Sequence, residues 1–438
     1  MKPISLLIFF LILTVSCSNG FKLTEKIAAV EKTDSCRVDS QHTYEVYIPE
    51  RSSSLEKLPL LVIIDAHGNG KFALEKFKYG ASHYPAILIA SNLVKNGFLN
   101  YETAIQTLVE DVRQKYPAGE TLFITGFSGG ARMALGYALQ EHVNGLILCG
   151  ALSGASELHS LHCTVISISG TDDFNFMETA QYLFQEQSMP PNLKIELTNA
   201  SHNWPDSILL SNQLGFLYLS LRQATDIPSP AKSELKQFEQ QQYSRIDSRK
   251  EQGDILEATW IARNMSTTAL FGNDKRFGSV YNELKASKAY SSQLDQLKNS
   301  LQFEINARQP YLEAFYNQDS LWWQNEIYSI RKKIETGQNR FKKDMYKRIT
   351  GFLGIACYSL GNQAIQERNA QNLTKIISVY RMLEPENSYV LYFSAFPYFW
   401  QGNNRTAISL LKKAKEAGFS DTNQMKNDFP VSITSEIN

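Results

Sequence analysis

The sequence has little that would suit it to binding nucleic acids or to metal and redox chemistry. Lysine plus arginine and aspartate plus glutamate number 44 each in 438 residues, so no excess of positive charge is available for a polyanion. No set of His, Cys, Asp or Glu shows metal-ligand spacing, and no glycine-rich phosphate or dinucleotide loop stands in a supporting context. We therefore expect no nucleic-acid partner, no metal and no cofactor.

Cysteine is scarce, with five in the chain. Cys149 is predicted to end one parallel strand and Cys163 to begin the next, which places them at opposite edges of a sheet. They are therefore not expected to pair with each other. A buried free thiol is the prediction for each of Cys36, Cys149, Cys163 and Cys357.

Only the N-terminus carries a long apolar run, over residues 4–15 after Lys2. The run is too short to span a membrane, and it predicts an export signal over residues 1–16. Ser16 and Cys17 directly after it resemble the lipobox of bacterial lipoproteins, which implies lipidation of Cys17. Ordinary signal cleavage and a retained anchor are the alternatives. We expect an exported, lipid-anchored protein of the bacterial envelope, in the periplasm or at the cell surface, with a tether over residues 17–39.

The remaining chain divides by composition into two parts. From residue 40 to 223, short runs rich in Ile, Val and Leu alternate with amphipathic stretches, as in strands that crossover helices bury on both faces. This pattern predicts an α/β domain with a doubly wound, mostly parallel sheet. A linker is predicted over 224–234, and residues 235–438 have the spacing of an all-helical domain.

The end of the helical part shows an internal repeat. Two units, over residues 354–387 and 388–421, resemble tetratricopeptide repeats, with Gly402 at the turn between two helices and Ala395, Ala407 and Ala414 at packing positions. A generic array of helical hairpins is the alternative. Either array would stack helices into a scaffold and would offer a surface to a protein partner.

The most informative motif is the run Gly126, Phe127, Ser128, Gly129, Gly130, between an apolar strand and a helical stretch. A turn sharp enough to expose a serine hydroxyl crowds its neighbours, and glycine tolerates that contact because it has no Cβ. The pattern predicts Ser128 as a nucleophile. An ordinary glycine-rich turn with an incidental serine is the alternative.

A nucleophilic serine needs a histidine to take its proton and a carboxylate to orient that histidine. Where the serine lies at such a strand-to-helix turn of a parallel sheet, the nucleophile, the acid and the base follow in the order Ser, Asp, His at the ends of successive strands. The strand over 164–169 runs into Asp172 and Asp173, and the strand over 193–197 runs into the loop that carries His202. We predict Asp173 as the acid, with Asp172 as the alternative, and His202 as the base.

Acyl transfer also needs two N–H groups directed at the developing oxyanion. The backbone N–H of Gly129 is predicted as the first. The second is predicted in the loop after the strand over 58–64, at the backbone of Asn69, with Gly68 as the alternative. His67, in the same loop, is expected to be structural.

These residues together resemble the α/β hydrolase superfamily over positions 40–223. Within it, the His67–Gly68 turn, the run GFSGGARMA from Gly126 and the run HNWP from His202 resemble secreted esterases of the polyhydroxyalkanoate depolymerase and feruloyl esterase type. The resemblance implies hydrolysis of a carboxylic ester through an acyl-enzyme. A serine peptidase of the same fold, or a non-catalytic scaffold lipoprotein, is the alternative. Few residues separate Leu148 from Thr164, so no inserted lid is expected and the cleft is predicted to be open.

Overall fold

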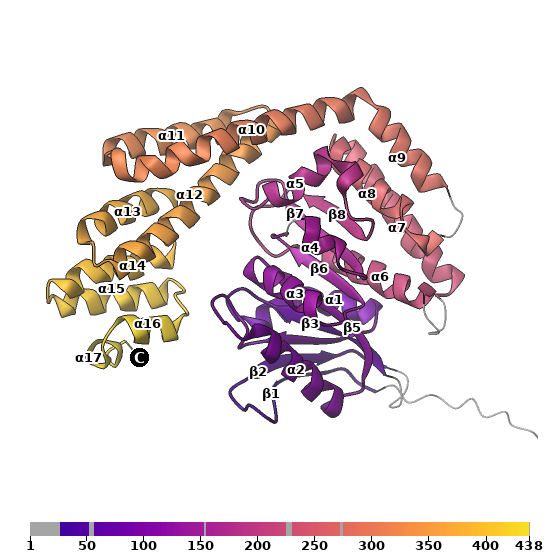
Figure 1. Cartoon of the computed structure of the whole chain (residues 1–438), viewed down its shortest axis with the longest axis horizontal. Coiled ribbons are helices and arrows are strands. Elements are labelled where there is room, and N and C mark those ends of the chain that lie inside the picture. Colours follow the sequence, from indigo (N-terminus) through magenta and orange to yellow (C-terminus); the bar gives the residue numbers. More distant parts are fainter. Residues whose placement is uncertain (1–26, 52–56, 153–154, 225–229, 272–274, 438) are drawn as a thin grey trace, which may run out of the picture.

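The fold is described from a computed structural model of the chain, covering residues 27–51, 57–152, 155–224, 230–271 and 275–437 (Figure 1). The predicted signal over residues 1–16, Cys17 and the first part of the predicted tether lie outside the described residues. Within the described ranges, no helix combines the length and apolar character needed to cross a membrane.

An eight-stranded sheet forms the centre of the N-terminal half, in the order β1-β2-β4-β3-β5-β6-β7-β8. The strands are β1 (Val30–Ser35), β2 (Thr43–Ile48), β3 (Leu58–Ile64), β4 (Ile87–Ser91), β5 (Ala118–Phe127), β6 (Gly145–Cys149), β7 (Thr164–Gly170) and β8 (Leu193–Thr198). Strands β3 to β8 are parallel, and β1 and β2 add an antiparallel edge. The carboxyl ends of β3 to β8 therefore meet at one edge of the sheet.

The burial of each strand follows from its place in the sheet. All five residues of β4 and of β6 are buried, because helices cover both faces of the parallel part. Strand β2 alternates between half-buried and buried residues. Its sequence, TYEVYI, alternates in the same way, as expected for a strand with one face against the core.

Helices pack against both faces of the sheet and give it two apolar cores. One core holds the buried residues of α2, α3 and α5, and the other holds those of α1 and α6. The helices of this half are α1 (Gly70–His83), α2 (Tyr101–Lys115), α3 (Gly129–Gln140), α4 (Ala155–His159), α5 (Met177–Phe184) and α6 (Ser207–Ala224). The predicted α/β fold class, a mostly parallel doubly wound sheet followed by an all-helical region, is confirmed.

The N-terminal boundary differs from the prediction. Residues 30–35, which were expected to belong to the tether, form β1 and pair with β2. The strand was missed because most of its residues are exposed and polar, so the segment VEKTDS lacks the apolar run that marks a buried strand.

The second half of the chain is entirely helical in its described residues, apart from connecting turns. Its helices are α7 (Lys232–Glu251), α8 (Ile255–Ser266), α9 (Arg276–Ala286), α10 (Lys288–Asn317), α11 (Ser320–Thr336), α12 (Arg340–Gln366), α13 (Ala370–Leu383), α14 (Ser388–Trp400), α15 (Asn404–Glu416), α16 (Thr422–Asp428) and α17 (Val431–Thr434). Helix α7 begins inside the predicted linker.

This half is not one separate body. Helices α7, α8 and α9 share a core with α1 and α6, so they extend the sheet domain. A third core begins near the end of α10 and continues to the C-terminus. In Figure 1, α10 to α17 form an arc that leaves the sheet domain at one end and approaches it again at the other.

The predicted repeat units coincide with helical pairs. Helices α14 and α15 fall within the unit over 388–421, and Gly402 lies between them with a φ of 76°. Ala395, Ala407 and Ala414 are buried. A helical pair of this kind is common to both alternatives, so the resemblance to tetratricopeptide repeats stays a prediction.

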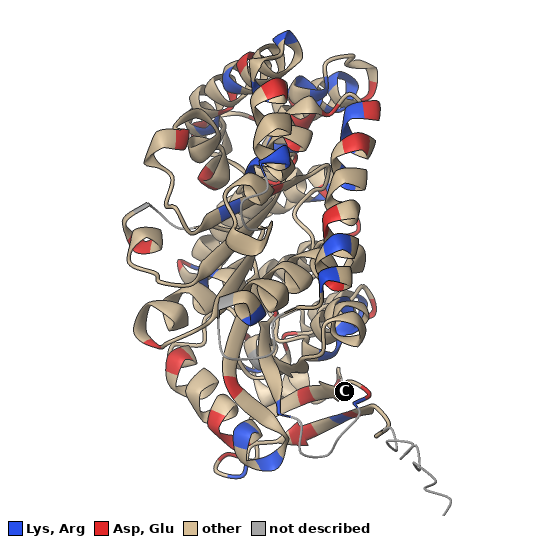
Figure 2. Ribbon diagram, turned by 90° about the vertical axis from the view of Figure 1, so that its right-hand side faces the viewer, with Lys and Arg blue, Asp and Glu red and all other residues tan. Residues whose placement is uncertain are grey.

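Cys36, Cys149, Cys163 and Cys357 are buried free thiols, as predicted. Burial raises the pKa of the Cys36 and Cys163 thiols to about 11, which keeps them protonated and unreactive at neutral pH. On the face shown in Figure 2, residues of both charge signs are interspersed along the helices.

Candidate active site

Ser128 lies in the turn that joins β5 to α3, with a backbone φ of 55° and ψ of −117°. This conformation is uncommon for a residue with a side chain. The two flanking glycines explain how it is accommodated. A Cβ on Gly126 would lie 2.2 Å from the carbonyl oxygen of Gly130, and a Cβ on Gly130 would lie 2.1 Å from that of Ile64. The glycines are therefore required by close backbone contacts, and the turn presents the serine at the edge where the strands end.

The structure brings Ser128, His202 and Asp173 together in one chain of hydrogen bonds. Ser128 Oγ lies 2.9 Å from His202 Nε2, and His202 Nδ1 lies 2.9 and 2.8 Å from the two carboxylate oxygens of Asp173. A carboxylate only accepts, so Nδ1 carries the proton and Nε2 is free to accept the serine proton. Asp173 is buried and His202 is partly exposed.

The two adjacent carboxylates after β7 have different partners. Asp173 contacts His202, and its Oδ1 also accepts a 2.8 Å hydrogen bond from the backbone N–H of Asn175. Asp172 turns away and forms a 2.8 Å ion pair with Lys347 of α12. Geometry therefore places Asp173, the preferred candidate, beside the histidine and gives Asp172 a contact with the helical half.

Aromatic rings hold His202 from two sides. The ring centroids of Phe127 and Phe174 lie 4.7 and 4.2 Å from that of His202. Trp204 donates from Nε1 to Asp65 Oδ2 over 2.9 Å and is itself in contact with Phe127. The loop that carries His202 is thus fixed both by packing and by a buried hydrogen bond.

Asp65 occupies the two N–H groups that the sequence suggested for the oxyanion. Its Oδ1 accepts from the N–H of Asn69 at 3.2 Å and of His67 at 2.9 Å, and its carbonyl oxygen accepts from the N–H of Gly68 at 3.0 Å. The predicted second donor, Asn69, and its alternative, Gly68, are therefore both engaged within their own loop. The side chain of Asn69 caps α1 by accepting from the N–H of Phe72.

The side-chain amide of Asn96 lies beside Gly129. A Cβ on Gly129 would lie 1.7 Å from Asn96 Oδ1 and 3.2 Å from Asn96 Nδ2, so the Asn96 side chain occupies the space beside the Gly129 backbone. The Asn96 backbone N–H is held by the carbonyl of Ala66 at 2.9 Å. Sequence reasoning missed Asn96 because it lies in the loop after β4, for which the motif makes no prediction.

The helical half contacts the loops that carry Asp173 and His202. Thr171 Oγ1 donates to Asp344 of α12 over 3.0 Å, and the carbonyl of Phe174 accepts from Arg308 of α10 over 2.8 Å. Between β6 and β7, the described residues form only the short α4, so no lid is inserted there. Helices from the second half nevertheless lie against the loop that carries Asp173, on one side of the site.

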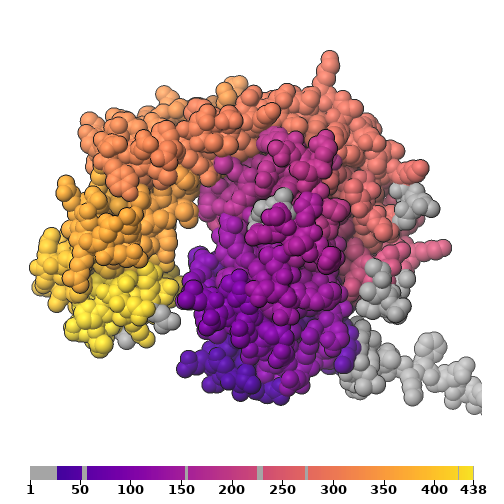
Figure 3. Space-filling model, viewed as in Figure 1, coloured from indigo at the N-terminus to yellow at the C-terminus, as the bar shows by residue number. Residues whose placement is uncertain are grey.

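The arc of helices also meets the sheet domain on the other side of Ser128. Lys95, next to Asn96, forms a 3.6 Å ion pair with Asp421 at the start of α16. In Figure 3, a gap remains between the middle of the arc and the sheet domain, and the yellow C-terminal helices approach the sheet domain below it. The two contacts therefore flank the face on which Ser128 lies.

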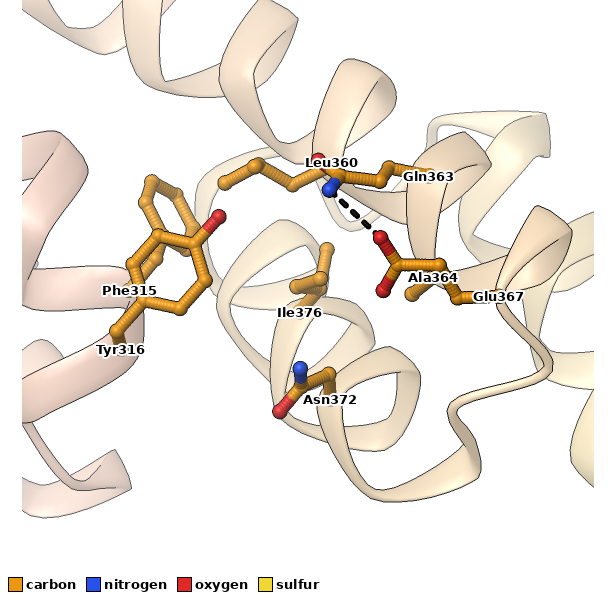
Figure 4. Close-up of a pocket in the computed structure, with 8 residues that line it drawn as sticks. All are labelled: Phe315, Tyr316, Leu360, Gln363, Ala364, Glu367, Asn372 and Ile376. Carbon is orange, nitrogen blue, oxygen red and sulfur yellow. Dashed lines mark hydrogen bonds between the residues drawn. The ribbon is translucent and has the colours of Figure 1, made fainter.

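A separate pocket in the helical half has a different character. It is formed by α10, α12 and α13, and its lining includes Phe315, Tyr316, Leu360 and Ile376 (Figure 4). Gln363 donates to Glu367 at its rim over 2.8 Å. No serine, histidine or cysteine lines it, so it offers no nucleophile of the kind found at Ser128. Among the described residues, no group of three or more His, Cys, Asp or Glu is arranged to hold a metal ion.

Comparison with known proteins gives only distant similarity. No protein-family model and no curated protein matches the sequence. Among solved structures, the chain is similar to Est1E from Butyrivibrio proteoclasticus, with 11% identity over 43% of this chain and 96% of that one and a TM-score of 0.34. It is also similar to a feruloyl esterase module from Clostridium thermocellum, complexed with sinapinate, with 12% identity over 43% and 87% of the two chains and a TM-score of 0.37. An S-formylglutathione hydrolase from Agrobacterium tumefaciens is similar at 12% identity over 43% and 93%, with a TM-score of 0.33. With identities of 11 to 12% and TM-scores of 0.33 to 0.37, these similarities carry no functional argument.

Proposed function

We propose that the protein is a serine hydrolase that cleaves carboxylic esters through an acyl-enzyme. The observation that carries the proposal is the continuous hydrogen-bonded chain from Ser128 Oγ through His202 to Asp173. If the turn were an ordinary glycine-rich turn, its serine would not be expected to align with a histidine and a buried carboxylate from two other loops. A positive φ at Ser128 adds a strained backbone at the same point.

The chemistry follows from the three groups. Ser128 Oγ attacks the ester carbonyl while His202 Nε2 takes its proton, and Asp173 holds the imidazole and stabilises its positive charge. Collapse of the tetrahedral intermediate breaks the bond to the alcohol oxygen, which receives the proton from Nε2. Water then attacks the acyl-enzyme by the same route, with His202 as the base, and the acid and free Ser128 are released.

The negative oxygen of the intermediate needs two donors. The backbone N–H of Gly129 follows the nucleophile directly, and we assign it as the first. The Asn96 side chain supplies the second, because its amide fills the space beside Gly129. Rotation of that amide by a half-turn brings Nδ2 to the position of Oδ1, so either end of the group can face the site.

Export and anchoring belong to the same proposal. The apolar run over residues 4–15 and Cys17 support a lipoprotein of the bacterial envelope, with the membrane reached only through the lipid. An ester in that compartment is the substrate we propose, and the exposed helices of the second half are the surface for a protein partner.

The test is covalent labelling and turnover with the purified protein. Wild type is treated with a fluorophosphonate probe and assayed with short aryl esters, beside Ser128→Ala and the control Ser201→Ala, a neighbouring exposed serine. We expect labelling and hydrolysis in wild type and in Ser201→Ala, and neither in Ser128→Ala. A wild type that is neither labelled nor active would refute the enzyme and favour a scaffold. Cleavage of aminoacyl amides in preference to esters would point to a peptidase instead.

A further inference from the structure

Helix α12 lies against both loops that complete the candidate triad. Its N-terminal residue Arg340 donates to Asn199, in the loop that leads from β8 to His202. One turn later Asp344 accepts from the Thr171 hydroxyl, and Lys347 pairs with Asp172. The acid loop and the base loop are therefore both in contact with a single helix that lies far away in the sequence.

These contacts all come from one face of α12. Positions 344, 347, 348 and 351 follow position 340 by 4, 7, 8 and 11 residues, which are the spacings that bring side chains to the same side of a helix. At the last of them, Gly351, a Cβ would lie 3.1 Å from the Phe174 ring. Phe174 in turn packs on the His202 ring at 4.2 Å. The face thus extends from the base loop to the ring that covers the histidine.

The most deeply buried contact of α12 is an ion pair. Arg348 and Glu304 of α10 are both fully buried, and Arg348 Nε lies 2.7 Å from Glu304 Oε2. Arg348 Nη1 also donates to the carbonyl of Thr171, two residues before Asp173. Glu304 pairs at the same time with Arg308, which donates to the carbonyl of Phe174 over 2.8 Å. Two arginines thereby hold the backbone on both sides of Asp173.

We infer that α12 is a positioning helix for the triad, and that the Arg348–Glu304 pair sets the place of Asp173. The inference rests on the proposed function and adds a role for the helical half. A buried charge pair is a costly way to join two domains, because apolar residues of similar volume pack as well without the loss of hydration. A guanidinium can contact a carboxylate and a carbonyl simultaneously in fixed directions, which a lysine cannot. The pair therefore gives the acid loop a fixed geometry that apolar packing would not supply.

The experiment is a double-mutant cycle in the full-length protein. Arg348→Met is made in wild type and in Asp173→Asn, and kcat and KM are measured with an activated aryl ester. In wild type we expect kcat to fall by about 10- to 100-fold with KM nearly unchanged, since a misplacement near 1 Å is enough for such a loss. In Asp173→Asn the same substitution should change kcat by less than about twofold, because no functional acid remains to be positioned. Arg348→Lys should recover part of the loss.

Arg263→Met is the matched control. Arg263 of α8 forms a 2.7 Å ion pair with Glu186, which precedes β8 at the opposite end of the strand from His202. Glu186 keeps Lys285 as a second cation, just as Glu304 keeps Arg308. The control should lower thermal stability and leave kcat unchanged.

Two results would overturn the inference. One is wild-type kcat in Arg348→Met, and the other is an equal fractional loss in wild type and in Asp173→Asn, which a general loss of structure would produce. If Arg348→Met fails to fold, Lys347→Met replaces it. The Lys347 side chain is half-exposed, so this substitution removes the ion pair with Asp172 without leaving a cavity in the core. It should lower kcat by about 3- to 10-fold in wild type only, and no change would equally refute the inference. Fluorophosphonate labelling of wild type distinguishes these outcomes from failure of the proposed function itself.

Discussion

If the Asn96 amide contacts the oxyanion, two different substitutions, one at Asn96 and one at Gly129, should each lower kcat. Asn96→Ala removes the amide, and Gly129→Ala adds a Cβ that would lie 1.7 Å from Asn96 Oδ1 and so must displace it. Loss of one oxyanion donor lowers kcat by about 10²- to 10³-fold. Because Asn96 is exposed, water can partly take the place of its amide, and we expect about 100-fold for either substitution.

The combination of the two substitutions is the sharper measurement. In Asn96→Ala the clash at position 129 no longer exists, so adding Gly129→Ala should lower kcat by less than about twofold more. KM for a short aryl ester should change little in all three variants, since the donors act on charge that develops in the transition state. Leu99→Ala is the control, because Leu99 lies in the same loop and is 88% exposed. Wild-type kcat in Asn96→Ala, or losses that multiply in the double variant, would show that the amide does not contact the oxyanion.

Two further predictions concern the neighbouring carboxylates and the acid stability of the contact between Glu186 and helices α8 and α9. Asp173→Asn should lower kcat by about 10³- to 10⁴-fold, because the histidine loses its orienting acceptor, whereas Asp172→Asn should cost less than about tenfold; equal losses would contradict the assignment of Asp173. Burial alone would raise the pKa of Glu186, but hydrogen bonds from Lys285, Tyr281 and Arg263 lower it to about 2 from an ordinary 4.5. Since the pKa is lower in the folded state, Glu186 stabilises the fold above pH 4.5, and this stability is lost as the pH falls toward 2. The difference amounts to about 3 kcal/mol. In urea unfolding, Glu186→Gln should therefore be less stable than wild type at pH 6, and the gap should shrink at pH 3; a gap that does not depend on pH would refute the ionic origin.

The elements that sequence predicts well are those whose chemistry is local. The sheet of buried strands follows from short apolar runs, and Ser128 follows from a turn that only glycines can flank. Asp173 and His202 were found because parallel strands bring their carboxyl ends to one edge, so each loop after a strand is a limited place to search. The exposed polar strand β1 has no such local signal, and neither does the boundary between the two halves, because α7 is held by tertiary packing.

Contacts between distant segments could not be predicted. Asn96 reaches Gly129 from a loop with no motif, and Asp65 occupies the Asn69 N–H through a side chain that the sequence left without a role. Arg348 looks like an ordinary helical arginine until α10 and the acid loop are placed around it. In each instance the local sequence is compatible with several partners, and only the packed chain selects one.

The contact between Arg348 and Thr171 joins positions 177 residues apart in the chain. Synthesis proceeds from the N-terminus, and domains tend to fold as they emerge. The sheet, the serine turn and the two loops are all complete once about half of the protein has been made, yet the helix that lies against those loops has not been translated. A nascent or truncated chain ending near residue 224 therefore holds Ser128, Asp173 and His202 without the support of α12, and the proposed hydrolase would reach its full rate only late in its own biosynthesis.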